Sequence, residues 1–288
     1  MKPIQIAYYS DLHLEYSSIS LKSTHSDVIV VAGDLWAGEP EKGIFWMQEQ
    51  FPEKPVLFVP GNHDFEFVPR IEAIQRFKKV AQGTNVHVLC EEVWNYQGIR
   101  FLGTPFYSAF DLHGDTLKQV EKTMQACQAY LPVGDYWEKE YGDVFDMHQC
   151  RHLALESRAW LTQELAKAQL EQQETVVITH WAPSPQCLHP RFLEKPNNAY
   201  WANPCDDMVK QTQLWIHGHT HDTHQHHLGN NPYRGHICCN PRSVCSSNEL
   251  AQPYFEWNPS VCVWRADQIR NLQIHHQTIH QKNQKQEI

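Results

Sequence analysis

The stretch IQIAYYSDLH (residues 4–13) decides the fold, because a short run rich in Ile and Tyr ends abruptly in an Asp and a His. Two similar runs follow at Val28–Ala32 and Val56–Val59, and each also leads into polar residues. Short Val/Ile-rich runs of this kind are typical of strands that are buried on both faces. Residues at helical spacing over Glu41–Gln50 and Val68–Ala81 alternate with these strands, so the sequence predicts an α/β fold with helix-covered sheets.

The same alternation continues through the rest of the chain. Further strands are predicted at Val86–Leu89, Val93–Tyr96, Ile99–Leu102, Thr175–Thr179, Leu214–His217, Gly235–Cys239 and Val261–Trp264, and helices at Asp115–Ala129 and Arg151–Gln172. The first three of these strands are close enough together to form a meander.

Length alone allows between one and three domains, and we interpret residues 1–276 as one. Residues 103–147 differ from the rest because they are aromatic and rich in turn residues, and we interpret them as an insertion or cap that could overhang a site, with a second small subdomain as the alternative. Residues 277–288 are rich in Gln, Lys and Asn, so we expect a frayed polar tail there.

The charge balance narrows the possible partners. The chain of 288 residues has 24 Lys and Arg against 33 Asp and Glu, which gives a formal net charge of −9. This balance disfavours a broad nucleic-acid surface. The sequence contains no run of eighteen apolar residues, which a membrane span would need. Met1-Lys2-Pro3 leads directly into the first strand, so we expect no secretion signal. These features predict a cytoplasmic protein with no membrane partner.

Two residue types stand out by number. The nine cysteines form no C-x-x-C pair, so we expect reduced, mostly buried thiols and neither a disulfide framework nor a zinc ribbon. The 19 histidines are many for this length, and His is the commonest metal ligand in proteins.

Metal-binding side chains follow five of the predicted strands, at the point where each strand ends. They are Asp11 with His13, Asp34, Asn62 with His63 and Asp64, His180, and His219 with His221. Because the carboxyl ends of strands face the ligand crevice in open α/β sheets, we expect the five segments to meet at one edge. Carboxylate, imidazole and amide oxygen together suit Mn, Fe or Zn. The sequence therefore predicts a metal site built from separate segments.

Taken together, these segments resemble the signature of the calcineurin-like metallophosphoesterase superfamily, which reads D-x-H, G-D, G-N-H-[D/E], H and G-H-x-H in this order. The matching residues are Asp11 and His13, Gly33-Asp34, Gly61-Asn62-His63-Asp64, His180, and Gly218-His219-Thr220-His221. The resemblance covers roughly residues 4–264, and the surroundings of His180 and Arg242 are similar to a small bacterial-type subgroup of predicted phosphohydrolases. It implies a four-layer sandwich of two mixed β-sheets flanked by helices, with a dimetal site at the carboxyl edge of the strands.

The resemblance also implies which residues hold the two divalent ions. One ion would be held by Asp11, His13, Asp34 and His221, and the other by Asp34, Asn62, His180 and His219, so that Asp34 would bridge them. Two dications about 4 Å apart repel each other, and a shared carboxylate reduces that repulsion. Mn, Fe and Zn all suit these donors, and Mn is favoured for an assay.

The function that the resemblance implies is a metal-dependent phosphoesterase. A hydroxide bridging the two ions would attack phosphorus in line, His63 would assist the leaving oxygen, and Asp64 would orient the His63 ring. The expected substrate is a small phosphorylated molecule. Whether it is a phosphodiester or a phosphomonoester is left open, and so is the oligomeric state.

Three further residues are candidate substrate contacts. Trp36 follows the bridging Asp by two positions, and Trp181 follows a ligand His directly. Arg242 could clamp a phosphate, because a guanidinium fork fits phosphate oxygens, although a surface or ion-paired Arg is an equal alternative.

The remaining histidines near the signature are expected to be structural. His217 ends a predicted strand and should pack or form a hydrogen bond there. His224, His226 and His227 follow in a predicted hairpin and should lie on its solvated face.

Two alternatives to a phosphoesterase stay open. A non-catalytic, metal-binding interaction scaffold on the same fold would be expected to have eroded ligands, and none is eroded here. Metal sensing or storage by the His-rich segments would predict exchangeable metal beyond two equivalents and no turnover of phosphate esters.

Overall fold

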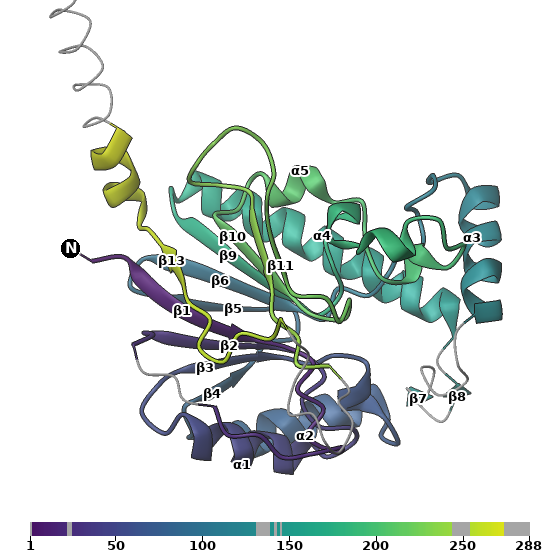
Figure 1. The fold of residues 1–288 in the computed structure, drawn as a ribbon, viewed down its shortest axis with the longest axis horizontal. Helices are drawn as coiled ribbons and strands as arrows, with labels where there is room; N and C mark the ends of the chain where they lie inside the picture. The colour runs from purple at the N-terminus through teal and green to yellow at the C-terminus, as the bar shows by residue number, and fades with distance from the viewer. Residues whose placement is uncertain are drawn as a thin grey trace, which may run out of the picture.

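The strand–helix alternation produces two mixed sheets that pack face to face between helices (Figure 1). The computed structural model describes residues 2–21, 25–130, 139–140, 143–144, 146–243 and 254–273. The predicted α/β architecture of two mixed sheets flanked by helices is confirmed.

Each sheet is mainly parallel, with one antiparallel edge strand in the five-stranded sheet and one at each edge of the six-stranded sheet. The five-stranded sheet consists, in spatial order, of β13 (Val261–Val263), β1 (Ile4–Tyr9), β2 (Val28–Ala32), β3 (Val56–Val59) and β4 (Val86–Val88). The six-stranded sheet consists of β11 (His224–His227), β12 (His236–Cys239), β10 (Leu214–His217), β9 (Glu174–Thr179), β6 (Ile99–Thr104) and β5 (Glu92–Tyr96). A short ribbon pairs β7 (Lys139–Glu140) with β8 (Asp143–Val144).

Residues on the two faces of each strand enter different parts of the core. Ile6 and Tyr8 of β1 lie between the two sheets, together with Val176 and Ile178 of β9. Ala7 and Tyr9 point the other way and pack beneath the helices. This alternation follows from the two-residue period of a strand, and burial on both faces explains why the strands are almost wholly apolar.

Two helix layers cover the outer faces of the sheets (Figure 1). The helices α1 (Pro40–Gln50) and α2 (Arg70–Ala81) pack on the five-stranded sheet, and α4 (Met147–Leu170) and α5 (Asp206–Val209) pack on the six-stranded one. Helix α4 begins four residues before the predicted start. Its start is fixed by a capping box, in which the Asp146 side chain accepts from the backbone N–H of Gln149 and the Gln149 side chain accepts in return.

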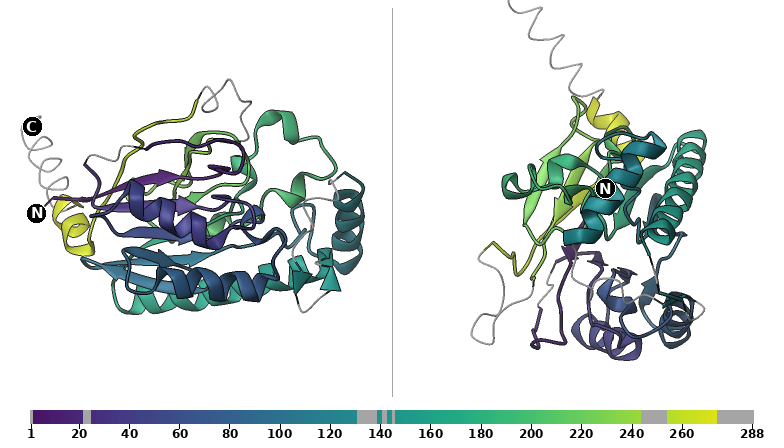
Figure 2. Two further views of the ribbon diagram at one scale, coloured as in Figure 1. Left: turned by 90° about the horizontal axis from the view of Figure 1, so that it is seen from below. Right: turned by 90° about the vertical axis from the view of Figure 1, so that its right-hand side faces the viewer.

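Helix α3 (Leu117–Tyr130) lies beyond the ends of the sheets, at one end of the molecule (Figure 2). It belongs to the predicted insertion and shares a hydrophobic cluster with the first turns of α4. The predicted tail at 277–288 lies outside the described residues. No helix in the described part of the chain has both the length and the apolar character that a membrane crossing needs.

The predicted meander at 86–102 is wrong. Strand β4 pairs with β3 in the five-stranded sheet, whereas β5 and β6 pair with each other in the six-stranded sheet. The chain crosses from one sheet to the other over 89–91, where Glu91 adopts a left-handed conformation with φ of 50°. Strands that are close in sequence therefore do not pair here, because β4 is an edge strand of the five-stranded sheet and β5 is an edge strand of the six-stranded sheet.

Candidate metal centre

Five strands bring the predicted metal ligands to one edge of the molecule. Asp11 and His13 follow β1, Asp34 follows β2, and Asn62 follows β3, all in the five-stranded sheet. His180 follows β9, and His219 and His221 follow β10, in the six-stranded sheet. The site is therefore built where the carboxyl ends of parallel strands from both sheets meet.

The backbone at this edge is unusual. Five of the seven predicted ligands have a positive φ: Asp11 at 48°, His13 at 46°, Asp34 at 55°, His219 at 68° and His221 at 55°. Left-handed backbone is rare for residues other than Gly, and it is concentrated at functional sites, where surrounding structure holds it in place. Sharp turns directly after the strands aim these side chains inward instead of letting them alternate along an extended chain.

The glycines of the signature are needed for close approach. A Cβ on Gly61 would lie 2.2 Å from Asp34 Oδ1, and a Cβ on Gly218 would lie 2.6 Å from Asp11 Oδ2. Both distances are far below van der Waals contact. Backbone thus packs directly against the carboxylates, which leaves no room for any other residue type.

Two groups of donor atoms result, and Asp34 belongs to both of them. The first group contains Asp11, His13, Asp34 and His221, with His221 Nε2 3.3 Å from Asp11 Oδ1 and His13 Nε2 4.0 Å from Asp34 Oδ2.

The second group contains Asp34, His180 and His219. His180 Nε2 lies 3.1 Å from Asp34 Oδ2 and 3.2 Å from Oδ1 of Asn62. The structure therefore brings together all seven residues that the sequence predicts as ligands. Asp34 lies between the two groups, as a ligand shared by two ions would have to.

Several ring nitrogens in this site have lone pairs directed at the space between the carboxylates. Nδ1 of His13 lies 2.8 Å from Glu15 Oε1, and Nδ1 of His180 lies 2.9 Å from the backbone oxygen of Ala32. These oxygens accept hydrogen bonds, so each ring carries a proton on Nδ1. Among the described residues, His13 Nε2 and His219 Nε2 are buried without a hydrogen-bond partner. An imidazole that is oriented by a carboxylate or carbonyl and has a bare Nε2 is the usual form of a metal-bound His, so the donors fit divalent ions.

Burial and neighbouring charges shift the pKa values of several side chains in the site. Burial opposes ionisation of Asp11, but the hydrogen bond from His221 and the charges of His221 and His180 together outweigh it and lower the pKa of Asp11 to about 2. Burial also opposes a charged His180, but the Asp34 carboxylate outweighs it and raises the pKa of His180 to about 9. Burial lowers the pKa of His219 well below its usual range, so this ring is neutral. A dication bound here would take over the charge that the His180 proton otherwise supplies.

Asp64 has a different partner from the one that the sequence predicts. Its carboxylate accepts hydrogen bonds from the backbone N–H groups of Asp34, Leu35, Trp36 and Gly61, and not from His63. His63 Nδ1 instead lies 2.5 Å from Oε1 of Glu66. The 3₁₀ turn η1 (His63–Phe65) directs the two neighbouring side chains apart, so Asp64 ties together the loops after β2 and β3, and Glu66 orients His63.

Trp181 and Arg242, both predicted to contact substrate, are buried beneath the site. The Trp181 ring lies 4.4 Å from the His219 ring and 4.6 Å from that of Tyr107, centroid to centroid. Arg242 is 1% exposed and donates to the backbone oxygens of Leu12 and Ser17 at 2.8 and 2.7 Å. Both side chains therefore support ligand-bearing segments from below.

Trp36 packs against the core of the five-stranded sheet, with the Lys42 ammonium 5.5 Å from its ring centre. These contacts place it with α1 and not at the open face of the site.

A cleft of about 830 Å³ opens above the metal-binding residues. Its outer wall is formed by residues that the sequence analysis missed, namely His189, Arg191, Phe192, Trp201 and Tyr254. Arg191 pairs with Asp222 at 2.7 Å, also at the cleft. The described part of the predicted insertion, 103–147, supplies no residue to this wall. Most of the wall comes from residues 189–201, in the irregular stretch after His180. Its Pro, Arg and aromatic residues were the signal that could have identified it.

The chain belongs to the calcineurin-like phosphoesterase family, whose model matches residues 4–223. Family membership together with the two Asp/His groups supports a metal-dependent phosphoesterase, and thus a hydrolase, at the level of the superfamily. No curated protein sequence is similar enough to this chain to count as a match.

One solved structure has a similar fold over most of both chains. Phosphopantetheinyl hydrolase from Mycobacterium tuberculosis superposes with a TM-score of 0.60 at 16% identity, over 90% of this chain and 96% of that one. A putative 5'-nucleotidase from Staphylococcus aureus, solved in complex with alpha-ketoglutarate, matches with a TM-score of 0.46 at 13% identity, over 82% of this chain and 48% of that one.

Proposed function

We propose that the protein is a dimetal phosphoesterase that hydrolyses a small phosphorylated substrate in the cleft above Asp34. The observation that carries this proposal is the set of oriented imidazoles at the cleft floor. Nε2 of His13 and Nε2 of His219 are buried without a hydrogen-bond partner in the described part of the chain, and His180 Nε2 faces the oxygens of Asp34 and Asn62. Two divalent ions held by the two groups would satisfy the first two nitrogens and replace the proton on the third.

The metal-binding residues and His63 would have different roles in hydrolysis. Bound ions would polarise a phosphoryl oxygen and make water more acidic at the site. His63 lines the cleft, and because its Nδ1 is engaged by Glu66, proton transfer to a leaving oxygen would use Nε2. The Glu66 carboxylate accepts from Nδ1 and so orients the ring for such a transfer.

The outer wall of the cleft suits a substrate that extends beyond the phosphate. Phe192, Trp201 and Tyr254 offer aromatic surface, and Arg191 offers a positive charge near the mouth. We therefore favour a phosphate ester whose leaving group is apolar or aromatic, since such a group can stack on these rings.

Hydrolysis of two synthetic esters by Mn²⁺-loaded protein tests the proposal. Bis-p-nitrophenyl phosphate reports diesterase activity and p-nitrophenyl phosphate reports monoesterase activity, each against a chelator-treated sample. We expect metal-dependent turnover of at least one of them. Asp34→Asn should weaken both ions together, by more than about tenfold, and abolish turnover.

Asp207→Asn is the matched control, because Asp207 is 95% exposed and pairs only with Lys210 among the described residues. It should keep two Mn²⁺ per chain and full activity. Absence of turnover in protein that is shown to hold two ions would contradict the proposal for these esters and favour the interaction scaffold.

A further inference from the structure

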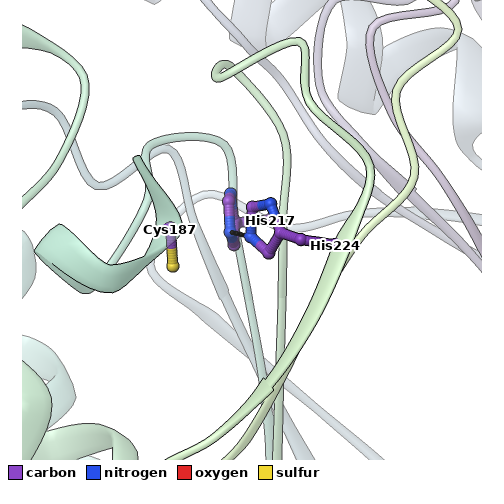
Figure 3. Close-up of side chains that lie close together, drawn as sticks. All are labelled: Cys187, His217 and His224. Atoms are coloured by element: carbon purple, nitrogen blue, oxygen red, sulfur yellow. Dashed lines mark hydrogen bonds between the residues drawn. The ribbon is translucent and has the colours of Figure 1, made fainter. Parts of the chain in front are cut away.

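A second cluster of metal-binding side chains lies outside the candidate metal centre. It consists of Cys187 at the end of the 3₁₀ turn η3 (Pro185–Cys187), His217 at the end of β10 and His224 at the start of β11 (Figure 3). Their donor atoms all lie within 4.8 Å of one another. Cys187 and His217 are fully buried, and His224 is half-buried. The predicted solvated face is therefore wrong for His224, whereas His217 packs and forms hydrogen bonds as predicted.

The hydrogen bonds of the two imidazoles fix where their protons are. His217 Nδ1 lies 2.8 Å from the backbone oxygen of Gly218, and His224 Nδ1 lies 2.9 Å from that of Asp222. A carbonyl oxygen only accepts, so both rings carry a proton on Nδ1. The two Nε2 atoms then present lone pairs to each other at a distance of 3.0 Å (Figure 3). The three contacts need three N–H protons, and two neutral rings carry only two.

A cation between the rings would resolve this conflict. Two imidazoles held by backbone carbonyls, with their Nε2 atoms converging, have the orientation that metal-binding His residues take. In a tetrahedral zinc site the nitrogens of two His ligands are about 3.3 Å apart, so the rings need to move by only a few tenths of an ångström.

The third member of the cluster indicates which cation fits. Cys187 adds a sulfur, and soft thiolate ligands favour Zn²⁺ over Mn²⁺. This donor set differs from the candidate metal centre, where all ligands are nitrogen and oxygen. A fourth ligand could come from solvent, because the side of the cluster at His224 is half-exposed.

We propose that Cys187, His217 and His224 form a third metal site, which binds Zn²⁺ independently of the two ions at Asp34. The chain between the two histidines carries His219 and His221. A zinc ion here would join β10, β11 and η3 at the base of that loop and so hold two ligands of the metal centre in place.

Metal content and cobalt spectroscopy test the site on the full chain. Zn²⁺ loading followed by gel filtration should leave three equivalents per chain, and Mn²⁺ loading should leave two. Co²⁺ loading should produce a near-ultraviolet thiolate-to-cobalt charge-transfer band, which nitrogen and oxygen ligands do not give. Cys187→Ser should lose one Zn²⁺ equivalent and the whole band.

Cys205→Ser is the matched control, because Cys205 is also a buried thiol of the same hydrophobic cluster but is not part of the metal-binding group. It should keep both the third equivalent and the band. If Cys187→Ser does not fold, His224→Gln provides a second variant at a half-exposed edge position, and it should also lose the third equivalent.

Wild-type protein that binds only two Zn²⁺ per chain and shows no charge-transfer band would overturn the site. The two rings would then share an extra proton instead of a metal ion. A third equivalent that survives Cys187→Ser and His224→Gln would equally overturn the assignment. None of these measurements depends on phosphoesterase activity.

Discussion

His63 has a carboxylate partner, Glu66, on the turn that it begins. His63 lines the cleft and is 24% exposed, so its ring can reach a bound substrate, and Glu66 beside it is 19% exposed. The pair therefore has the arrangement of a proton donor with an orienting base.

Glu66→Gln should reduce kcat by about 10- to 100-fold while both metal ions stay bound. The Gln side chain keeps a hydrogen-bonding group beside Nδ1 but removes the carboxylate that orients the ring. His63→Ala should lose more, about 10²- to 10⁴-fold, and should lose the dependence on this group altogether. The measurement is kcat against pH, with metal content determined for each variant.

Glu39→Gln serves as the control, since Glu39 is an exposed residue that pairs with Lys42 away from the cleft. Its pH profile should match that of the wild type. An unchanged kcat in Glu66→Gln would remove the pair from proton transfer.

Residue type and position were enough to predict which seven side chains come together at the candidate metal centre, but not which partners orient the side chains beside them. Asp, Asn and His directly after strands are rare enough in combination to be recognised without a structure. Asp64 and Glu66 are both acidic and both close to His63 in sequence, and only the 3₁₀ turn decides which of them faces the ring. The cluster at Cys187 was missed because His217 and His224 are 30 and 37 residues after Cys187 in the sequence. The three side chains come together only in the folded protein.

At the scale of elements, the loop after β1 depends on a buried arginine. Nη1 of Arg242 donates to the backbone oxygens of Leu12 and Ser17, and Nη2 donates to the Ser17 hydroxyl. This loop contains Asp11 and His13 in left-handed conformations, which need support from their surroundings. Arg242 is therefore a positioning residue for one side of the metal centre.

Arg242→Met should destabilise the protein by about 2–4 kcal/mol, because it keeps most of the volume but leaves buried carbonyls without donors. The midpoint of thermal unfolding should fall by several degrees, and metal affinity should fall with it. Arg76→Met removes an arginine from a partly exposed pair with Glu41 and should cost no more than about 1 kcal/mol. A raised KM with unchanged thermal stability in Arg242→Met would instead support a phosphate clamp.

The elements themselves were largely predictable, whereas their pairing was not. The strands at 4–9, 28–32 and 56–59 have the predicted bounds, because strands buried on both faces are apolar and end sharply. Nothing in the local sequence indicates that β4 and β5 belong to different sheets. The part of the cleft wall at 189–201 was not predicted either, because tertiary packing decides which segment lies beside the site.

At the scale of the whole molecule, the candidate metal centre lies where the two sheets meet. The five-stranded sheet supplies Asp11, His13, Asp34 and Asn62, and the six-stranded sheet supplies His180, His219 and His221. Each of the two donor groups contains residues from both sheets. Bound ions would therefore hold the sandwich together at this edge, where two buried carboxylates otherwise repel each other.

Metal removal should consequently lower the stability of the whole fold. An ion that binds only the folded chain stabilises it by about 2.7 kcal/mol at a concentration 100 times its Kd. Thermal unfolding with Mn²⁺ and with a chelator should differ by several degrees in the wild type. The difference should almost vanish in Asp34→Asn, which removes the ligand that both groups share. It should persist in Cys187→Ser, because Mn²⁺ does not favour a thiolate site. Equal midpoints with and without Mn²⁺ in wild-type protein would show that the ions do not tie the sheets together, since a ligand that stabilises nothing binds the folded and unfolded chains alike.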